Sequence, residues 1–318
     1  MSPDARTYLT SLTVLSIVRA RRTWLKGGEV ATDWKIGDRI QNRWEIHRIL
    51  RGGMGIVYIV YDHEHREAYA AKTFQDDVFA RSHIAADRFT QEALTWVNLD
   101  FHQNVAEARF VQTIRGKPFL FLEYVSGGDL GGWIGSPRLI EDLPQVLRFA
   151  IEFCDGMIQA LSKGVKAHRD IKPQHCLVTE DNKLKITDFG LAKMFDELVL
   201  EQLAGPQRDV QSLSIGHTRT GLAAGTCTHM APEQFDDAKH VDVRADIYSF
   251  GVMLFQMATG QLPFAGRTWQ EFERLHKTQP PAHLSHASAH PLDALIHACL
   301  PKTPPTVLRG LGRGGIDW

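Results

Sequence analysis

The sequence predicts an α+β protein in which a small antiparallel sheet precedes a helical region. Short runs rich in β-branched and aromatic residues dominate residues 44–125, which is typical of strands. After Gly127-Gly128, apolar residues recur at spacings of three and four, the period of an amphipathic helix. Residues 244–259 are apolar on nearly all sides, which predicts a helix at the centre of the helical region.

The predicted strands follow one another through short connections. Trp44, Ile46 and the pair Ile49-Leu50 give a first strand, and residues 56–61 give a second. The turn between them, Gly52-Gly53-Met54-Gly55, joins two strands, whereas the glycine loop of a dinucleotide-binding fold opens into a helix. Further strands are predicted at residues 68–74, 108–113 and 118–125, with a helix over 87–99.

The helical region is predicted to begin with a helix over residues 143–161, which Gly164 closes. We expect its apolar stripe to belong to the core. The stripe consists of Leu143, Val146, Leu147, Ala150, Ile151, Cys154, Ile158 and Leu161.

Composition places the 318-residue chain among ordinary globular proteins, with 43% hydrophobic and 23% charged residues. The net charge of −1 provides no bulk field that would attract nucleic acid or an anionic membrane. The four cysteines form no CxxC pair, which argues against a zinc ribbon or a disulfide framework and suits a reducing cytoplasm. No apolar run reaches about eighteen residues, so no membrane span is expected.

Two short motifs carry the chemistry. His168-Arg169-Asp170-Ile171-Lys172-Pro173 precedes two strand-like runs, residues 176–178 and 184–186, and Asp188-Phe189-Gly190 follows them. A hairpin of these runs would bring Asp170 and Asp188 toward one edge. Two carboxylates and a lysine there suit phosphoryl transfer, since one acid accepts a hydroxyl proton and the other holds a metal ion on the phosphates. The alternative for such short strings is a solvated loop with ordinary surface charges.

These motifs, together with the glycine turn, resemble the catalytic core of the eukaryotic-like (Hanks-type) serine/threonine protein kinases of bacteria. The resemblance covers residues 44–304 and implies a bilobal protein kinase fold, with an N-lobe over 44–125 and a C-lobe over 126–304. Residues 1–40 would then form an extension, part of it disordered, and residues 305–318 a tail. The implied cofactors are ATP and Mg²⁺ or Mn²⁺, and the implied partners are proteins with serine or threonine acceptors, without nucleic acid or a membrane span.

The resemblance implies catalytic roles for five residues. Asp170 would accept or orient the proton of the substrate hydroxyl, and Lys172 would contact the γ-phosphate. Lys72 would pair with the α- and β-phosphates and be held there by an ion pair with Glu92. Thr226 would hydrogen-bond near Asp170 and Lys172. For a lone lysine or glutamate, a solvated surface position is the ordinary alternative.

The nucleotide site implied by the resemblance consists of residues from the glycine turn, from the predicted sheet and from the connector after the sheet, residues 123–128. Backbone groups of Glu123 and Val125 would bind the adenine edge, and Asp129 would reach the ribose. Leu122 would be the gatekeeper, and Leu50 replaces the first glycine of the usual turn, which would stiffen its start. The full set is Leu50, Gly52, Gly53, Gly55, Val57, Ala70, Lys72, Leu122, Glu123, Val125, Asp129 and Leu177. The glycines are expected because a backbone that approaches phosphates closely needs positive φ angles and no side chain.

The metal site departs from the family pattern. Asp188 would be the principal ligand, but His175 stands where the family has an asparagine that helps to bind a second metal ion. Magnesium prefers hard oxygen ligands, whereas manganese accepts nitrogen more readily. Weakened magnesium activity, one-metal catalysis, a shift toward manganese and loss of catalysis therefore remain open. Another alternative is that His175 only hydrogen-bonds Asp170, as the asparagine can.

Later segments show further matches and departures. Ser212, Ser214, Thr218 and Thr220 are candidate activating phosphosites, and His229 replaces a tyrosine of the family pattern. Near the C-terminus, Arg309 is displaced from the position where the family pairs an arginine with Glu233, and the final helix of the C-lobe is expected to be missing.

We interpret the chain as a serine/threonine kinase that transfers the γ-phosphoryl group of ATP and autophosphorylates. The alternative is a pseudokinase that binds nucleotide or partners without catalysis, motivated by His175 and Leu50. A small-molecule phosphotransferase is disfavoured, because such enzymes generally lack the long segment that ends here at Ala231-Pro232-Glu233.

Overall fold

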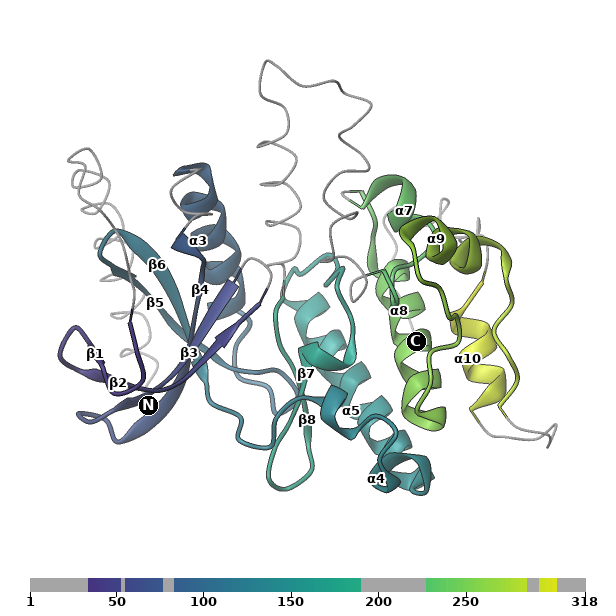
Figure 1. The fold of residues 1–318 in the computed structure, drawn as a ribbon, viewed down its shortest axis with the longest axis horizontal. Coiled ribbons are helices and arrows are strands. Elements are labelled where there is room, and N and C mark those ends of the chain that lie inside the picture. The colour runs from purple at the N-terminus through teal and green to yellow at the C-terminus, as the bar shows by residue number, and fades with distance from the viewer. Residues whose placement is uncertain are drawn as a thin grey trace, which may run out of the picture. The chain divides into compact units, whose positions relative to one another are not determined.

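The computed structural model of this chain describes residues 34–52, 55–76, 83–189, 227–238, 240–284 and 292–301 (Figure 1). The described residues fall into two compact units. The first comprises residues 34–128, 151–165 and 176–189. The second comprises residues 129–150, 166–175 and the described residues from 227 onward.

The first unit is built on a six-stranded sheet with the order β1-β2-β3-β4-β6-β5, and every neighbouring pair is antiparallel. Its strands are β1 (Arg39–Ile40), β2 (Trp44–Arg51), β3 (Gly55–Asp62), β4 (Glu67–Phe74), β5 (Ala108–Ile114) and β6 (Lys117–Glu123). Helix α3 (His83–Val97) follows β4 and packs on β5 and β6. The predicted sheet is therefore confirmed, with one two-residue strand added at its start.

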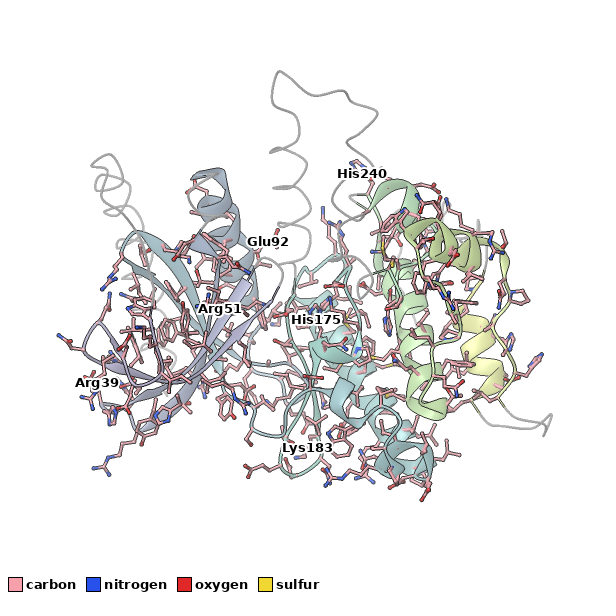
Figure 2. All side chains as sticks on the ribbon, in the orientation of Figure 1. Arg39, Arg51, Glu92, His175, Lys183 and His240 are labelled. Carbon is pink, nitrogen blue, oxygen red and sulfur yellow. The ribbon has the colours of Figure 1, made fainter. Side chains whose placement is uncertain are left out.

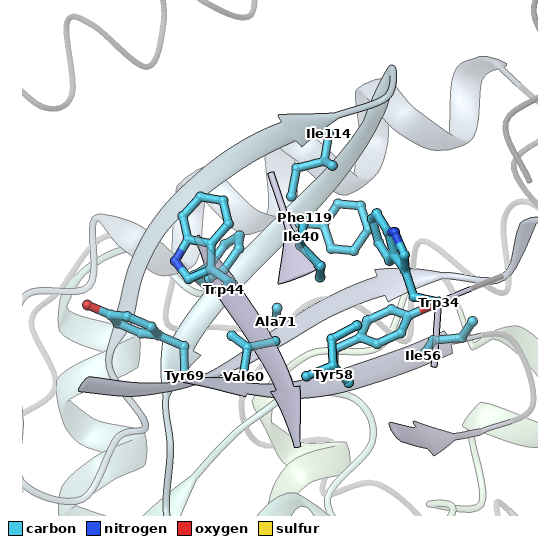
Figure 3. Close-up of a cluster of buried hydrophobic side chains, with 12 residues drawn as sticks. Trp34, Ile40, Trp44, Ile56, Tyr58, Val60, Tyr69, Ala71, Ile114 and Phe119 are labelled. Carbon is cyan, nitrogen blue, oxygen red and sulfur yellow. The ribbon is translucent and has the colours of Figure 1, made fainter. Parts of the chain in front are cut away.

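One face of this sheet carries an aromatic core (Figure 3). Alternate residues of β3 are buried, which is the period-two pattern of a half-buried strand. The buried cluster consists of Trp34, Ile40, Trp44, Ile46, Ile56, Tyr58, Val60, Tyr69, Ala71, Ile114, Phe119 and Phe121. Trp34 and Ile40 lie in the segment that we assigned to an extension, yet both are buried here. Trp34 packs edge-on against Tyr58 with ring centroids 5.5 Å apart, a tertiary contact that no local periodicity reports.

A second, two-stranded sheet in the same unit is the predicted hairpin. Strands β7 (Cys176–Val178) and β8 (Leu184–Ile186) are antiparallel, with Cys176 opposite Ile186. Ile186 also forms an isolated parallel bridge with Val105. Asn104 Nδ2 donates a hydrogen bond of 2.9 Å to the Leu184 carbonyl oxygen. The hairpin is thus fastened to the segment that precedes β5, and this fixes where the chain emerges toward Asp188.

The second unit is helical in its described residues. It contains η1 (Leu130–Trp133), α4 (Pro137–Ile140), the first turns of α5 (Leu143–Ser162), η2 (Pro173–His175), α7 (Gln234–Asp237), α8 (Val243–Thr259), α9 (Trp269–Thr278) and α10 (Asp293–Cys299). As predicted, α8 is buried along most of its length, although Ile247 is exposed. It begins at Asp242, whose side chain accepts the Arg244 N–H, and ends at Gly260 with φ 72°. A β-carbon at Gly251 would lie 2.6 Å from the Cys299 β-carbon, so this glycine lets α8 and α10 approach closely.

The predicted apolar stripe of α5 is wrong on one side. Leu147, Ile151, Cys154 and Ile158 are exposed. The buried side instead presents Val146, Phe149, Ala150, Phe153, Met157 and Ala160. Two overlapping stripes satisfy the same three- and four-residue spacing, and the bulkier aromatic one is buried. Within the described ranges, no helix combines the length and apolar character that crossing a bilayer requires.

Candidate active site

In the first unit, a lysine and an aspartate meet near the end of the β7–β8 hairpin. Lys72 lies on β4, opposite Val57 of β3 and Leu120 of β6. Its Nζ is 2.6 Å from Asp188 Oδ1, and the side chains are 14% and 16% exposed. Asp188 has φ 72°, a left-handed conformation that costs about 1–3 kcal/mol for a residue other than glycine. The fold therefore holds this carboxylate against the lysine in a strained backbone geometry.

The residue after this aspartate packs on helix α3. Phe189 is buried, and its ring meets Trp96 edge-on at a centroid distance of 5.8 Å. Trp96 is in turn fixed by a 2.9 Å hydrogen bond from Nε1 to the Ala106 carbonyl oxygen. Glu92 lies on α3 about one turn before Trp96 (Figure 2). The ion pair between Glu92 and Lys72 stays a prediction.

The glycine turn between β2 and β3 is closed by its own backbone. The Gly52 N–H donates to the Gly55 carbonyl oxygen at 2.9 Å, and Gln75 Nε2 donates to the Gly52 carbonyl oxygen at 2.6 Å. Neither Gly52 nor Gly55 has a positive φ, so that part of our reason for a glycine is wrong at these two positions, while the close approach of their backbone to phosphates stays a prediction. A β-carbon at Gly55 would make only an ordinary contact, 3.5 Å from the Thr73 carbonyl oxygen. A β-carbon at Gly52 would likewise make an ordinary contact, 3.7 Å from the Gly55 carbonyl oxygen, and Gly53 lies outside the described residues.

The neighbouring strands place the other predicted nucleotide-contacting side chains on one face. Val57, Ala70 and Lys72 are only partly buried and point away from the aromatic core, since their strand neighbours are the buried residues. Leu122 is opposite Ala70 in the β4–β6 pair. Leu177 is partly buried on β7, and Leu50 is 46% exposed at the end of β2. The face opposite the aromatic core thus gathers the predicted residues of the six-stranded sheet, whereas Leu177 lies in the separate β7–β8 sheet.

The connector after β6 is held by an ion pair that the sequence analysis missed. Glu123 Oε1 accepts hydrogen bonds from the Glu107 N–H and from Lys185 Nζ, each at 2.7 Å. The Glu123 N–H donates to the Glu107 carbonyl oxygen at 2.9 Å. Lys185 is a buried cation on β8, with Nζ 5.8 Å from the Phe101 ring centroid. A lysine inside the apolar run 184–186 was the available signal, because a buried lysine requires a partner.

The connector has glycines at two positions where a side chain would clash or strain the backbone. A β-carbon at Gly127 would collide with the Val178 carbonyl oxygen. Gly128 has φ 80°, and its carbonyl oxygen accepts the Val178 N–H at 2.8 Å. The connector is therefore tied to β7 immediately after Val125. Asp129, predicted to reach the ribose, is partly buried at the start of η1 in the second unit.

In the second unit, a buried aspartate organises the loop that carries the first motif. Asp246 lies on α8 and is 2% exposed. Its two carboxylate oxygens accept the backbone N–H groups of His168 and Arg169, each at 2.7 Å. Arg169 has φ 71°, and its carbonyl oxygen accepts Gln234 Nε2 at 2.9 Å. Asp246 therefore anchors the backbone of the loop that carries the first motif.

The anchored loop places Asp170 beside the side chains of Lys172 and His175. Lys172 Nζ donates to Asp170 Oδ2 at 2.7 Å. His175 Nδ1 is 2.8 Å from the Asp170 carbonyl oxygen and 3.4 Å from Oδ2 (Figure 2). Burial raises the pKa of Asp170, but the charges of His175 and Lys172 outweigh it, so the net pKa lies below the ordinary value. An ionised Asp170 fits a group that accepts or orients a hydroxyl proton.

His175 therefore contacts Asp170, which was the simplest of our alternatives for this position. Its Nδ1 is engaged with the Asp170 carbonyl oxygen. Asp188 offers carboxylate oxygens, the donor type that Mg²⁺ prefers. The imidazole of His175, by contrast, is a poor substitute for the oxygen donor that the asparagine of the family provides.

His229, which replaces the tyrosine of the family pattern, is buried in the second unit. Its Nε2 is 3.0 Å from Gln256 Oε1 on α8, and its Nδ1 is 2.8 Å from Thr228 Oγ1. Burial lowers the pKa of His229 to about 4, so the ring is neutral at pH 7. Thr226, the four candidate phosphosites and Arg309 lie outside the described residues.

Comparisons with known proteins agree with these arrangements. A family model described as a protein kinase domain matches residues 44–306. The serine/threonine-protein kinase Pkn1 of Myxococcus xanthus is 31% identical over 281 residues, which cover 86% of this chain and 37% of the relative. A probable serine/threonine-protein kinase of Clostridium perfringens is 30% identical over 273 residues, covering 85% and 37%. The probable kinase PknB of Lactococcus lactis is 30% identical over 233 residues, covering 73% and 34%. The chain thus spans little more than a third of the length of these curated relatives.

Proposed function

Because the chain belongs to the serine/threonine protein kinase family, we propose that it transfers the γ-phosphoryl group of ATP to serine or threonine hydroxyls of proteins, its own among them. Kinases of this family use ATP and a divalent metal ion. The observation that carries the proposal is the loop around Asp170, whose backbone is anchored by Asp246 and whose carboxylate is paired with Lys172.

Asp170 and Lys172 would have different roles in the transfer to the acceptor hydroxyl. The lowered pKa keeps Asp170 ionised at neutral pH, so it can orient the acceptor hydroxyl and take up its proton. Lys172 lies within hydrogen-bonding distance of Asp170 and would stabilise the charge that develops on the transferred group. Arg169 and His168 contribute through their backbone N–H groups, which fix the loop to Asp246.

Lys72 and Asp188 serve the donor side. Lys72 would neutralise charge on the α- and β-phosphates, and Asp188 would hold the divalent metal ion through its carboxylate. The bound metal ion would neutralise charge on the phosphate oxygens. Their 2.6 Å contact shows that the two groups belong to one cluster. The partly exposed face with Val57 and Ala70, and the connector at Glu123–Val125, would receive the adenine.

The decisive experiment is transfer of labelled γ-phosphoryl from ATP to the chain itself and to a generic basic protein. We expect incorporation into serine and threonine by the wild type, and a loss of at least about 100-fold in Asp170→Asn, because the orienting carboxylate is removed. Unfolding curves of both proteins serve as the control for folding. A folded wild type that incorporates no label with any divalent metal ion would instead indicate a nucleotide-binding regulator without catalysis.

His175 should set the metal preference. We expect His175→Asn to raise activity with Mg²⁺ relative to activity with Mn²⁺, because an amide oxygen replaces an imidazole nitrogen at the position where the family has a metal-binding asparagine. The measurement is the ratio of kcat/KM with the two metals for wild type and variant at saturating metal. Equal ratios in the two proteins would show that His175 acts only through its contact with Asp170.

A further inference from the structure

A cluster of two histidines and an aspartate lies in the second unit, apart from the residues of the candidate active site. His283 precedes α10, while Asp293 and His297 lie one turn apart on that helix. One ligand atom from each of the three side chains lies within 4.8 Å of the others. Histidine nitrogen and carboxylate oxygen are the ligand types that Zn²⁺ and similar divalent transition metals take.

The two imidazole rings approach the same carboxylate. His283 Nδ1 is 2.7 Å from Asp293 Oδ2, and His297 Nε2 is 3.8 Å from Asp293 Oδ1. The rings are stacked, with centroids 4.4 Å apart and planes at 24°. Tetrahedral zinc ligands at ordinary bond lengths are about 3.3 Å apart, so these separations lie on either side of the required value. Small side-chain rotations would therefore bring all three atoms into one coordination sphere.

Two further observations point to a ligand. His297 Nε2 is a buried nitrogen with no hydrogen-bond partner among the described residues. Such a nitrogen is costly unless something binds it. Asp293 Oδ1 also accepts the Leu284 N–H at 2.8 Å, an outer hydrogen bond of the kind that orients metal-binding carboxylates.

A second cluster of potential metal ligands, in the first unit, already has a cation of the protein in its centre. Asp62, Glu64 and His65 in the first unit also lie close together. There, however, Arg43 Nη2 is 2.6 Å from Asp62 Oδ2 and 2.7 Å from His65 Nδ1. A guanidinium thus already occupies the positions that a cation would take. Among the residues that the structure describes, the cluster around His297 has only the hydrogen bonds of Asp293 in this role.

We propose that His283, Asp293 and His297 bind one divalent transition metal ion of the Zn²⁺ type, with water completing the coordination. The ion joins the segment before α10 to α10 itself, which packs on α8 next to Gly251. Its role is structural, because the ion would tie two segments of the chain together and stabilise the folded state by binding to it selectively. The inference does not depend on the proposed kinase activity.

The test is zinc binding by the full chain, freed of metal with a chelator and studied without nucleotide. We expect one equivalent of Zn²⁺ to bind in competition with a chromophoric chelator, and the midpoint of thermal unfolding to rise. Asp293→Asn keeps an acceptor for the Leu284 N–H but removes the charge, and His297→Gln removes the unpartnered nitrogen. Each should weaken Zn²⁺ binding at least about tenfold. Co²⁺ in place of Zn²⁺ should give an absorption spectrum that both variants lose.

Three controls separate this site from others. His240→Gln alters an exposed histidine that pairs with Asp237 without a second histidine, and should leave binding unchanged (Figure 2). Asp188→Asn and Cys154→Ser test the candidate active site and the exposed thiol. Unfolding in denaturant without metal shows whether each variant folds. Absence of stoichiometric binding in the wild type, or binding that His297→Gln leaves intact or that Asp188→Asn or Cys154→Ser abolishes, would overturn the proposal.

Discussion

At the residue scale, the partly buried Asp170 and the buried Asp246, which anchors its loop from α8, have pKa values shifted in opposite directions. The pKa of Asp170 lies below its ordinary value because the charges of His175 and Lys172 outweigh burial. Burial raises the pKa of Asp246, even though two backbone N–H groups bind its carboxylate. When their environments shift the pKa values of two carboxylates in opposite directions, the two groups are suited to different roles. Asp170 is suited to proton transfer, and Asp246 to holding the loop.

His229 should make the stability of the protein depend on pH. Its pKa is about 4 in the folded state and about 6.5 when unfolded, so the unfolded state binds more protons between these values. Stability is therefore retained above pH 6.5 and lost as the pH falls toward 4. We expect this histidine to account for about 2 kcal/mol of lost stability at pH 5. Denaturant unfolding at pH 7 and pH 5 measures the difference.

Two variants isolate this effect. His229→Gln cannot titrate, so its stability should fall by about 2 kcal/mol less than that of the wild type between the two pH values. His240→Gln removes an exposed histidine, with a side chain 82% exposed, and should behave like the wild type. An identical pH dependence of wild type and His229→Gln would contradict the assignment.

At the element scale, close contacts of glycines decide how neighbouring segments join. Gly127 lies against the Val178 carbonyl oxygen and ties the connector to β7, while Gly251 lets α8 approach α10. In both positions the added atom would meet another part of the chain, so the packing itself requires a glycine. In the turn between β2 and β3, by contrast, Gly52 and Gly55 would tolerate a β-carbon sterically.

Gly127→Ala should displace the connector from β7. The new β-carbon would collide with a backbone carbonyl, which cannot rotate aside as a side chain can. We expect a stability loss of about 1–3 kcal/mol and a KM for ATP raised several-fold, because Glu123 and Val125 lie in the same connector. Gly132→Ala is the matched control, since a β-carbon there has no atom within 4 Å. Unchanged unfolding and unchanged KM in Gly127→Ala would count against the connector as the adenine site.

At the scale of the whole molecule, the folded part extends beyond the residues that match the family model. The match covers residues 44–306, but Trp34 is 8% exposed and packs on Tyr58 and Phe119 of the sheet. The Arg115 guanidinium lies 5.4 Å from its ring centroid. The aromatic core therefore includes residues before the first long strand.

Trp34→Ala should destabilise the molecule as a whole. Removing a buried tryptophan costs about 3–5 kcal/mol, which corresponds to roughly 6–20 °C in Tm for a domain of this size. Ile36→Ala is the control, because Ile36 is 68% exposed two residues away. Calorimetry of the full chain measures both. A Trp34→Ala protein as stable as Ile36→Ala would show that the segment before β1 does not contribute to the core.

The sequence by itself determined the α+β class, the two hairpins, the central helix α8 and the motif residues around Asp170 and Asp188. These follow from local spacing, from turn residues and from a resemblance carried by short contiguous strings. The tertiary structure alone decided which side of α5 is buried, that Lys185 holds Glu123, that His175 turns to the Asp170 carbonyl oxygen, and that Trp34 joins the core. The cluster of His283, Asp293 and His297 is also of this kind. Such features depend on which side chains of distant segments meet in space. A periodic pattern within one segment carries no information about which other segment it will contact.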